Sequence, residues 1–379
     1  MMKKRLSTLI YGKADRVYLI SALLLAILGT VMVLSAGGAY ATAKYDDPYY
    51  FAKRQSIWLA IGVIALTLSS RIKIDLLKRL TPLMYALTLL LLGLTLAIGF
   101  VGNGAQRWIS IGPLTIQPSE IAKLTMVMML ALYFDKNEDS ACEIKQGAGS
   151  LINGTLLPAL IMLAPILLVM LQKHLSCIII LGTIGILLIV IAGVNTRYIS
   201  AFVLVAILGV SYIALFTDYT KDRITVWLDP EAYKLTGGWQ TLQGLMAIGS
   251  GGVFGKGIGM GELKHCYVSE PANDMIFAIL CEELGLFGAF CTLFCFGLLI
   301  MRGIRIAKGA PDCYTRLLTL GICIKMAVQV LLNVAVVTNT IPNTGISLPF
   351  FSYGGSSLVM LFFEMGIILS VTRESRLTK

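Results

Sequence analysis

The run VYLISALLLAILGTVMVLSA, residues Val17–Ala36, decides the class of fold, because it contains no charged side chain. About 20 apolar residues in an α-helix span the hydrocarbon core of a bilayer, which is roughly 30 Å thick. The run is too long for the apolar region of a cleaved signal peptide, and it has the wrong flanks for one. It therefore predicts a membrane-spanning helix.

Similar apolar runs recur along the whole chain. The 379 residues are 57% hydrophobic and 14% charged, whereas soluble domains average about 25% charged residues. The sequence therefore predicts an all-α integral membrane protein, with about ten transmembrane helices in one polytopic domain over residues 1–379. The predicted spans are Val17–Ala36, Ser56–Ser69, Leu80–Val101, Ile121–Phe134, Leu151–Leu171, Ser176–Gly193, Tyr198–Phe216, Met275–Met301, Leu317–Val337 and Ser356–Thr372.

The positive charges predict the orientation of these spans. With a cytoplasmic N-terminus, most of the 31 Lys and Arg residues fall in short inner segments, as the positive-inside rule requires. Both termini are then cytoplasmic. The net charge of +10 reflects this orientation. A nucleic-acid partner is not expected, because the cations are scattered over many short loops.

The eight cysteines and two histidines show no spacing that is typical of a metal site. His174 and His265 lie in different outer loops, and we interpret His174, in the run LQKHLS, as a loop residue. Most cysteines fall in spans or inner loops, where they are interpreted as small core residues rather than disulfide partners. The sequence predicts no metal ligands.

Three long outer segments, residues 102–123, 217–273 and 338–357, hold most of the unusual sequence. Structureless loops longer than roughly 12–15 residues are uncommon unless they are functional. In the middle segment, Trp239, Leu242, Leu245 and Met246 fall on one face of a helix. We predict a short amphipathic helix there, lying on the outer leaflet, within a long and partly ordered loop between spans seven and eight.

The glycine-rich run GSGGVFGKGIGMG, residues 249–261, does not fit a P-loop. A P-loop has Gly, four residues and then Gly-Lys-Ser/Thr, between a strand and a helix, whereas Gly257 follows Lys256 here. Two interpretations remain open. The glycines let backbone N–H groups approach a phosphate or sugar, or they form a tight turn packed on the helices.

Two other outer motifs also allow more than one interpretation. Arg107 and Trp108 anchor the chain at the membrane edge, or they bind a phosphate and stack on a sugar. Glu120 and Lys123, three residues apart, can pair on one helix face. The run NTGISLPFFSYGGSS, residues 343–357, lines a cavity or forms the start of an ordinary helix.

Three carboxylates lie close together in SEPANDMIFAILCEELG, residues 269–285. Asp274 is predicted at the outer end of the eighth span, where it can ionise. Glu282 and Glu283 lie roughly 12–14 Å deeper at about 1.5 Å per residue, too far to share one reacting bond with Asp274. We interpret these two as structural anchors that pair with buried cations such as Lys123 or Lys325.

Taken together, these motifs resemble the SEDS family (FtsW/RodA/SpoVE) over nearly the whole chain. The motifs that carry the resemblance are GAQRWISIGPLTIQPSEIAKL, GGWQTLQGLMAIGSGGVFGKGIGMG, NDMIFAILCEELGLFG and TGISLPFFSYGGSSL. The resemblance implies a ten-span peptidoglycan glycosyltransferase that polymerises lipid II outside the cytoplasmic membrane. It implies a class B penicillin-binding protein as the transpeptidase partner, together with other divisome or elongasome membrane proteins. The run PFFSYGGSS favours an FtsW-like member.

The resemblance also implies roles for single residues. Asp274 matches the essential acid of the family, and Trp108 matches its Trp in the second outer loop. The chain departs from the family at Lys173 and His174, where many members have Pro-Asp, so the role of that acid does not carry over. It also departs at Asn343, near which some members have a Lys in the last outer loop.

This chemistry assigns a role to each candidate. Asp274 would be the general base that takes a proton from the acceptor hydroxyl. Arg107, Arg223 and Lys256 would bind the diphosphate, with Mg²⁺ or Mn²⁺ as a compatible cofactor. Trp108 and Trp239 would contact sugar or lipid. The alternative function is a lipid II flippase, which the intramembrane charges of Glu282, Glu283, Lys123 and Lys325 favour.

Overall fold

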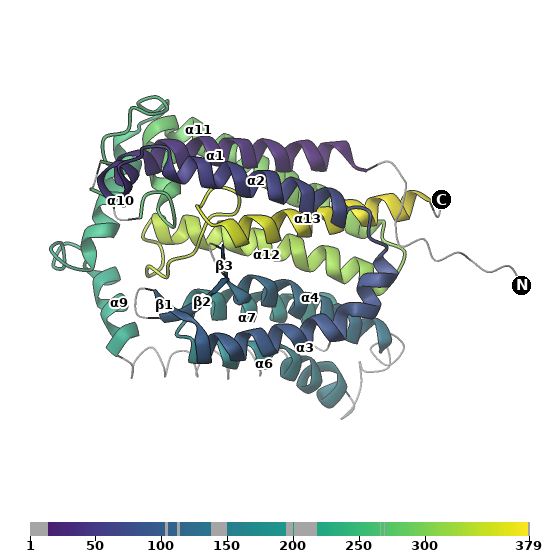
Figure 1. Cartoon of the computed structure of the whole chain (residues 1–379). Helices are drawn as coiled ribbons and strands as arrows, with labels where there is room; N and C mark the ends of the chain where they lie inside the picture. Colours follow the sequence, from purple (N-terminus) through teal and green to yellow (C-terminus); the bar gives the residue numbers. More distant parts are fainter. Residues whose placement is uncertain are drawn as a thin grey trace, which may run out of the picture.

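A computed structural model describes residues 14–102, 105–111, 114–137, 150–194, 200, 218–265, 267–268 and 270–377. Long helices form a bundle with roughly parallel axes (Figure 1). They are α1 (Arg16–Tyr45), α2 (Tyr50–Ser69), α3 (Ile74–Ile98), α4 (Pro118–Lys136), α6 (Leu157–Leu171) preceded by the π-helix η1 (Ser150–Leu156), α7 (Leu175–Ile191), α11 (Ile276–Lys308), α12 (Cys313–Val337) and α13 (Gly355–Leu377).

The helices confirm the predicted class, an all-α membrane protein. Among the described residues, seven helical segments are long and apolar enough to cross a bilayer, and the apolar α7 is shorter. Nine of the ten predicted spans coincide with a helix of the bundle, while Tyr198–Phe216 lies outside the described residues apart from residue 200. The short second span was predicted too short, because α2 begins at Tyr50 and includes the charged Lys53 and Arg54.

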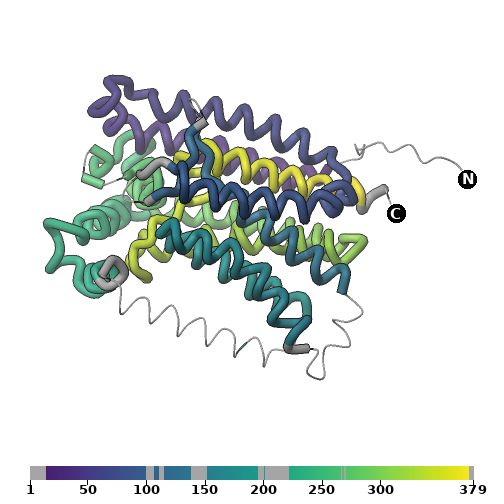
Figure 2. Tube along the Cα trace, turned by 60° about the horizontal axis from the view of Figure 1, so that its bottom comes forward, coloured from purple at the N-terminus to yellow at the C-terminus, as the bar shows by residue number. Residues whose placement is uncertain are grey.

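The two ends of the bundle differ. The start of α1 and the end of α13 lie at one end, which we call the terminal end, in both views (Figures 1 and 2). The opposite end, the loop end, carries α9 (Asp218–Leu228), α10 (Gly238–Ser250) and a small sheet (Figure 1). The sheet pairs β1 (Phe100–Gly102), β2 (Ala105–Ile111) and β3 (Leu114–Ile116) antiparallel in the order β1-β2-β3. Sequence reasoning did not predict it, because such short strands have no clear pattern.

A break in α11 determines how the glycine-rich run folds. At Gly285 the backbone has φ 67° and ψ −169°, and a Cβ there would lie 2.3 Å from the Gly255 nitrogen. Residues on either side of the break bond to the run instead. Leu286 N donates to Gly252 O (2.9 Å), and Lys256 N donates to Glu282 O (3.0 Å). The run is therefore a tight turn packed on a helix.

The predicted amphipathic helix is α10. It packs against α11 with Gly244, Ala247 and Gln243 buried, while Trp239 and Met246 are 39% and 55% exposed. Leu242 and Leu245 are half-buried, so the predicted apolar face is exposed only in part, and its position on the outer leaflet stays a prediction.

Candidate active site at the loop end

Asp274 lies at the loop end, two residues before α11. Its backbone is held by Asn333 of α12, whose side chain is fully buried. Asn333 Nδ2 donates to the carbonyl oxygens of Asp274 (2.9 Å) and Ile346 (2.7 Å). One amide therefore ties the start of α11 to the segment before α13.

That segment, residues 343–354, packs along the residues before Asp274. Ser352 Oγ donates to Asn273 O (2.7 Å) and accepts a hydrogen bond from Leu348 N (2.7 Å). Tyr353 N donates to Ala272 O (2.8 Å). A Cβ on Gly345, which has φ 67°, would lie 3.7 Å from Asp274 Oδ2. The 343–354 segment therefore forms one wall beside the carboxylate.

The carboxylate of Asp274 itself has a weak partner. Gln240 Nε2 of α10 lies 3.5 Å from both carboxylate oxygens, at the limit of a hydrogen bond. Burial, together with the smaller effect of the nearby charge of Glu270, raises the pKa of Asp274 to about 6. The group is therefore largely ionised at neutral pH and is a stronger base than an ordinary aspartate.

The buried acids of the bundle have a different environment. Each of the five most deeply buried Asp and Glu side chains among the described residues lies in an ion pair. These pairs are Asp15–Arg302 (2.7 Å), Glu120–Lys123 (2.7 Å), Glu282–Lys256 (3.0 Å), Glu283–Lys264 (2.7 Å) and Glu364–Lys325 (2.6 Å). The pairing of Glu120 with Lys123 was predicted from their spacing.

The predicted partners of Glu282 and Glu283 were wrong. Neither bonds to Lys123 or Lys325, which pair with Glu120 and Glu364. The glycine-rich turn folds back onto the break in α11 and brings its own cations, so Lys256 reaches Glu282 and Lys264 reaches Glu283. Both glutamates are 0% exposed, and the interpretation of them as buried anchors remains open to test.

Lys256 is engaged in this cluster. Its Nζ lies 3.0 Å from Glu282 Oε1 and 3.6 Å from Glu262 Oε2. A lysine that binds a diphosphate would direct its charge at the ligand instead. The geometry thus places Lys256 among the structural contacts of the turn.

The other candidates lie on separate elements of the loop end. Arg107 and Trp108 are on β2 and are half-buried, and Arg107 Nη2 donates to Lys173 O (2.6 Å). Arg223 of α9 donates through Nη1 to Asn343 O, so it contacts the 343–354 segment. Trp239 Nε1 donates to Tyr267 O (2.8 Å), next to Gln240 on α10. Arg223 and Trp239 therefore contact segments next to Asp274. Arg107 instead contacts the turn between α6 and α7, and Trp108 pairs with Phe100 in the sheet.

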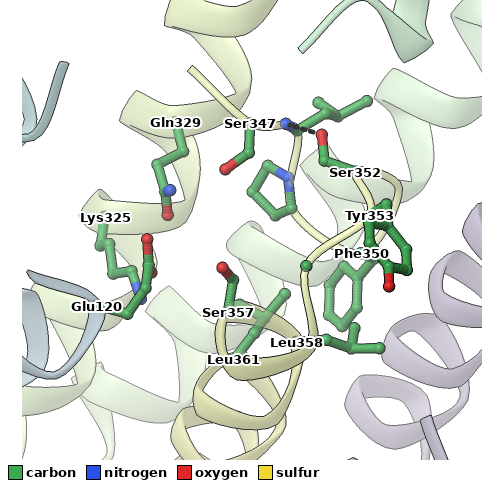
Figure 3. Close-up of a pocket in the computed structure, with 13 residues that line it drawn as sticks. Glu120, Lys325, Gln329, Ser347, Phe350, Ser352, Tyr353, Ser357, Leu358 and Leu361 are labelled. Atoms are coloured by element: carbon green, nitrogen blue, oxygen red, sulfur yellow. Dashed lines mark hydrogen bonds between the residues drawn. The ribbon is translucent and has the colours of Figure 1, made fainter. Parts of the chain in front are cut away.

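A small cavity is lined by residues of the 343–354 segment together with residues of α4, α12 and α13. Figure 3 shows Glu120, Lys325 and Gln329 facing Ser347 and Ser357 across it. Its volume is about 30 Å³, which is room for about two water molecules. The prediction that this segment lines a cavity is confirmed.

His174 lies in the turn between α6 and α7, in agreement with its interpretation as a loop residue, and its side chain is buried. It precedes α7 and is 9% exposed. Burial lowers its pKa to about 3, and the charges of Arg107 and Lys123 add to the effect, so the ring is neutral. Its neighbour Ser176 donates to Thr344 O, and the α6–α7 turn thus also contacts the 343–354 segment.

Sequence reasoning missed several residues of this region. Gln240, Asn333 and Ser352 hold or face Asp274, and as uncharged polar residues they gave no distinctive signal. Glu364 could have been found, because a charged residue in an apolar run needs a partner. Among the described residues, no group of three His, Cys, Asp or Glu side chains is arranged to hold a metal ion.

Comparison with known proteins shows similarity over the whole chain. The family profile described as "Cell cycle protein", for FtsW, RodA and SpoVE, matches residues 15–377. Stage V sporulation protein E of Bacillus subtilis is 38% identical, over 96% of this chain and 98% of that protein. A probable peptidoglycan glycosyltransferase FtsW of Geobacter metallireducens is 35% identical, over 96% and 95%. The similarity is thus shared between sporulation and FtsW-named proteins.

Solved structures show the same fold. A chain in the structure titled "Structural coordination of polymerization and crosslinking by a peptidoglycan synthase complex" superposes with a TM-score of 0.78 at 26% identity, over 96% of this chain and 99% of that one. The rod shape determining protein RodA of Thermus thermophilus superposes with a TM-score of 0.69 at 27% identity, over 94% and 96%.

Proposed function

Because this chain belongs to the FtsW/RodA/SpoVE family of multi-pass membrane proteins of peptidoglycan synthesis, we propose that it polymerises lipid II into glycan strands. The reaction would take place at the loop end of the bundle, on the outer face of the bacterial cytoplasmic membrane. The terminal end, with both chain ends, would face the cytoplasm.

One observation carries this proposal. The described carboxylates buried in the bundle are all bonded to Lys or Arg, whereas Asp274 has no Lys or Arg partner among the described residues: it faces the amide of Gln240 at 3.5 Å and the backbone N–H groups of Asp274 and Met275. A carboxylate held in an ion pair is a poor base, because protonation would break the pair. Asp274, with a pKa raised to about 6 by burial, suits proton transfer near neutral pH.

In the proposed step, Asp274 takes the proton from the acceptor sugar hydroxyl. The hydroxyl oxygen forms a bond to the anomeric carbon of the donor, and the bond from that carbon to the diphosphate oxygen breaks. The undecaprenyl diphosphate leaves with the electron pair, and the configuration at the anomeric carbon inverts. Because the diphosphate is a good leaving group, a second protein carboxylate is not required.

Arg107 and Arg223 are the proposed diphosphate ligands. A guanidinium has five N–H donors, so one bond to a backbone carbonyl does not use up its capacity for a phosphate oxygen. Trp108 and Trp239 are proposed to contact sugar or lipid. Lys256 is left out of this set because it bonds to Glu282 and Glu262.

The proposed partner is a class B penicillin-binding protein that crosslinks the new strand. Support comes from the structural relative, whose title describes polymerization and crosslinking by one synthase complex.

The test compares Asp274→Asn with Asp222→Asn as a matched control. Asp222 is an exposed acid of α9, also at the loop end. Labelled lipid II is incubated with each purified protein and the partner in detergent, and glycan is resolved on a gel. Asp274→Asn should lower polymer formation by about 10²–10⁴-fold, while Asp222→Asn should remain within about twofold of wild type. Full polymer from Asp274→Asn would refute the assignment.

Lipid II flipping is the second candidate, because Glu120–Lys123 and Lys325–Glu364 place charge inside the bundle beside a polar cavity. Intramembrane ionisable residues commonly mark transport paths. The two functions differ in detergent, where no bilayer separates two faces. Polymer formed there would support the glycosyltransferase, and its complete absence in the presence of an active partner would favour the transporter.

A further inference from the structure

A second cavity lies at the terminal end, on the far side of the bundle from Asp274. This groove of about 440 Å³ is formed between α3 and α4. Its lining combines charged and apolar side chains: Asp75, Lys78, Arg79, Pro82, Leu132 and Lys136. The groove also lies near the start of α12, because its lining residue Lys78 forms an ion pair with Asp312, the residue that precedes that helix. The groove takes no part in the site around Asp274.

The three cations of the groove are not equivalent. Lys78 Nζ lies 2.5 Å from Asp135 Oδ2 and 3.4 Å from Asp312 Oδ2, so its charge is neutralised and it joins α3 to its neighbours. Arg79 and Lys136 are exposed and form no ion pair with any described residue. Asp135 and Asp312 take up the charge of Lys78, so the exposed cations that remain available to a ligand in the groove are Arg79 and Lys136.

Below the cations, α3 presents an apolar face to the surroundings. Leu83, Leu87 and Leu90 are 57%, 51% and 58% exposed. Leu83 and Leu87 follow Arg79 at four-residue intervals, so they lie on the same helix face as the guanidinium. From Arg79 to Leu90 the helix rises roughly 16 Å, about the thickness of one leaflet of hydrocarbon.

This arrangement matches the chemistry of one class of molecule. A phospholipid has an anionic phosphodiester at the headgroup level and acyl chains that extend along the hydrocarbon core. A soluble anion would use Arg79 and Lys136 but would gain nothing from the leucine face. We propose that the groove between α3 and α4 binds an anionic phospholipid of the cytoplasmic leaflet, with its phosphate on Arg79 and Lys136 and its chains along Leu83, Leu87 and Leu90.

The probe is phosphatidylglycerol, compared with phosphatidylcholine of the same acyl chains, titrated into the full-length protein in detergent and followed by native mass spectrometry. Wild-type protein should retain phosphatidylglycerol in preference to phosphatidylcholine. The double variant Arg79→Gln/Lys136→Gln should weaken phosphatidylglycerol binding about thirtyfold, the effect expected for two basic residues near an anionic headgroup.

The matched control is Arg305→Gln/Lys308→Gln, which removes two exposed cations near the end of α11. It should leave the affinity within about twofold of wild type. Equal weakening by both double variants would show a diffuse surface charge effect and overturn the proposal. So would wild-type protein that binds both lipids equally, a result that does not depend on any variant folding.

A third arm separates a lipid from a soluble phosphate. Glycerol 3-phosphate carries the anionic group without acyl chains, and it should fail to displace phosphatidylglycerol at a hundredfold excess. Displacement at concentrations comparable with those of the lipid would identify a soluble-anion site and refute the assignment to a lipid.

Discussion

Removing the charge of Lys264 should destabilise the fold more than removing that of any exposed lysine. Its side chain is 5% exposed, with Nζ 2.7 Å from Glu283 Oε1, and Glu283 is itself 0% exposed. The variant Lys264→Met keeps most of the side-chain volume but leaves a buried carboxylate without a cation. Breaking a buried ion pair in this way costs about 3–5 kcal/mol. Ser35 Oγ still donates to Glu283, so we expect about 3 kcal/mol.

Lys256→Met is the internal control. Lys256 pairs with the adjacent Glu282, but its side chain is 28% exposed, so water can replace it. Glu282 also keeps hydrogen bonds from the backbone N–H groups of Glu262 (2.8 Å) and Leu263 (3.3 Å). The loss should therefore be clearly smaller than for Lys264→Met.

The assay is reversible unfolding by SDS in mixed micelles, with far-ultraviolet circular dichroism as the signal. A second variant, Lys264→Met/Glu283→Met, removes both charges and should recover much of the lost stability, since apolar replacement of a whole buried pair is often neutral. If Lys264→Met proves as stable as Lys256→Met, or if the double variant is the least stable of all, the reasoning about the buried pair is wrong.

Three further predictions concern the site and the turn. The base must be ionised to act, and burial raises the pKa of Asp274 to about 6. We therefore expect kcat/KM for polymerisation to fall about tenfold per pH unit below pH 6 and to be constant above it. A pH–rate profile that does not fall below pH 6 would contradict this assignment. Gly285→Ala should reduce the yield of folded protein, because the new Cβ would lie 2.3 Å from the Gly255 nitrogen. Gly297→Ala in the same helix is the control: its Cβ would meet no atom within 4 Å, so this variant should match wild type in size-exclusion chromatography. Asn333→Ala leaves the carbonyl oxygens of Asp274 and Ile346 without their hydrogen-bond donor, at a cost of about 1–3 kcal/mol for each unsatisfied group. The variant should therefore have a lower melting temperature and a lower kcat. An unchanged kcat would show that Asn333 does not position the base.

The bundle could be predicted from the sequence because lipid accepts only apolar side chains over whole helices. The first span shows this, since Val17–Ala36 lies wholly inside α1. The same reasoning misplaced the start of α2, where Lys53 pairs with Asp47 in the exposed first turns. Helical structure continues beyond the hydrocarbon region, where composition no longer reports on it.

The partners of the buried charges could not be predicted, because they depend on how loops return to the bundle. Glu282 and Glu283 could be placed by counting residues along a helix. The cations that reach them come from a turn that bonds to α11 only where Gly285 interrupts it. Likewise Lys325 and Glu364 lie 39 residues apart, on α12 and α13, and no local spacing relates them.

The environment of Asp274 divides into a fixed backbone and a loosely held side chain. Asn333, Ser352 and Tyr353 bond to the backbone carbonyls of residues 272–274, so the position of Cα is determined by two distant segments. The carboxylate, in contrast, has no Lys or Arg partner among the described residues, and it faces only uncharged donors: the amide of Gln240 at 3.5 Å and the backbone N–H groups of Asp274 and Met275. A structural acid would show the reverse, with a well-bonded carboxylate such as that of Glu283. A general base needs a fixed position but must exchange its proton freely, because each hydrogen bond to the charged form lowers its basicity. The distribution of contacts around Asp274 therefore favours a role in chemistry over a role in stability, independently of its pKa.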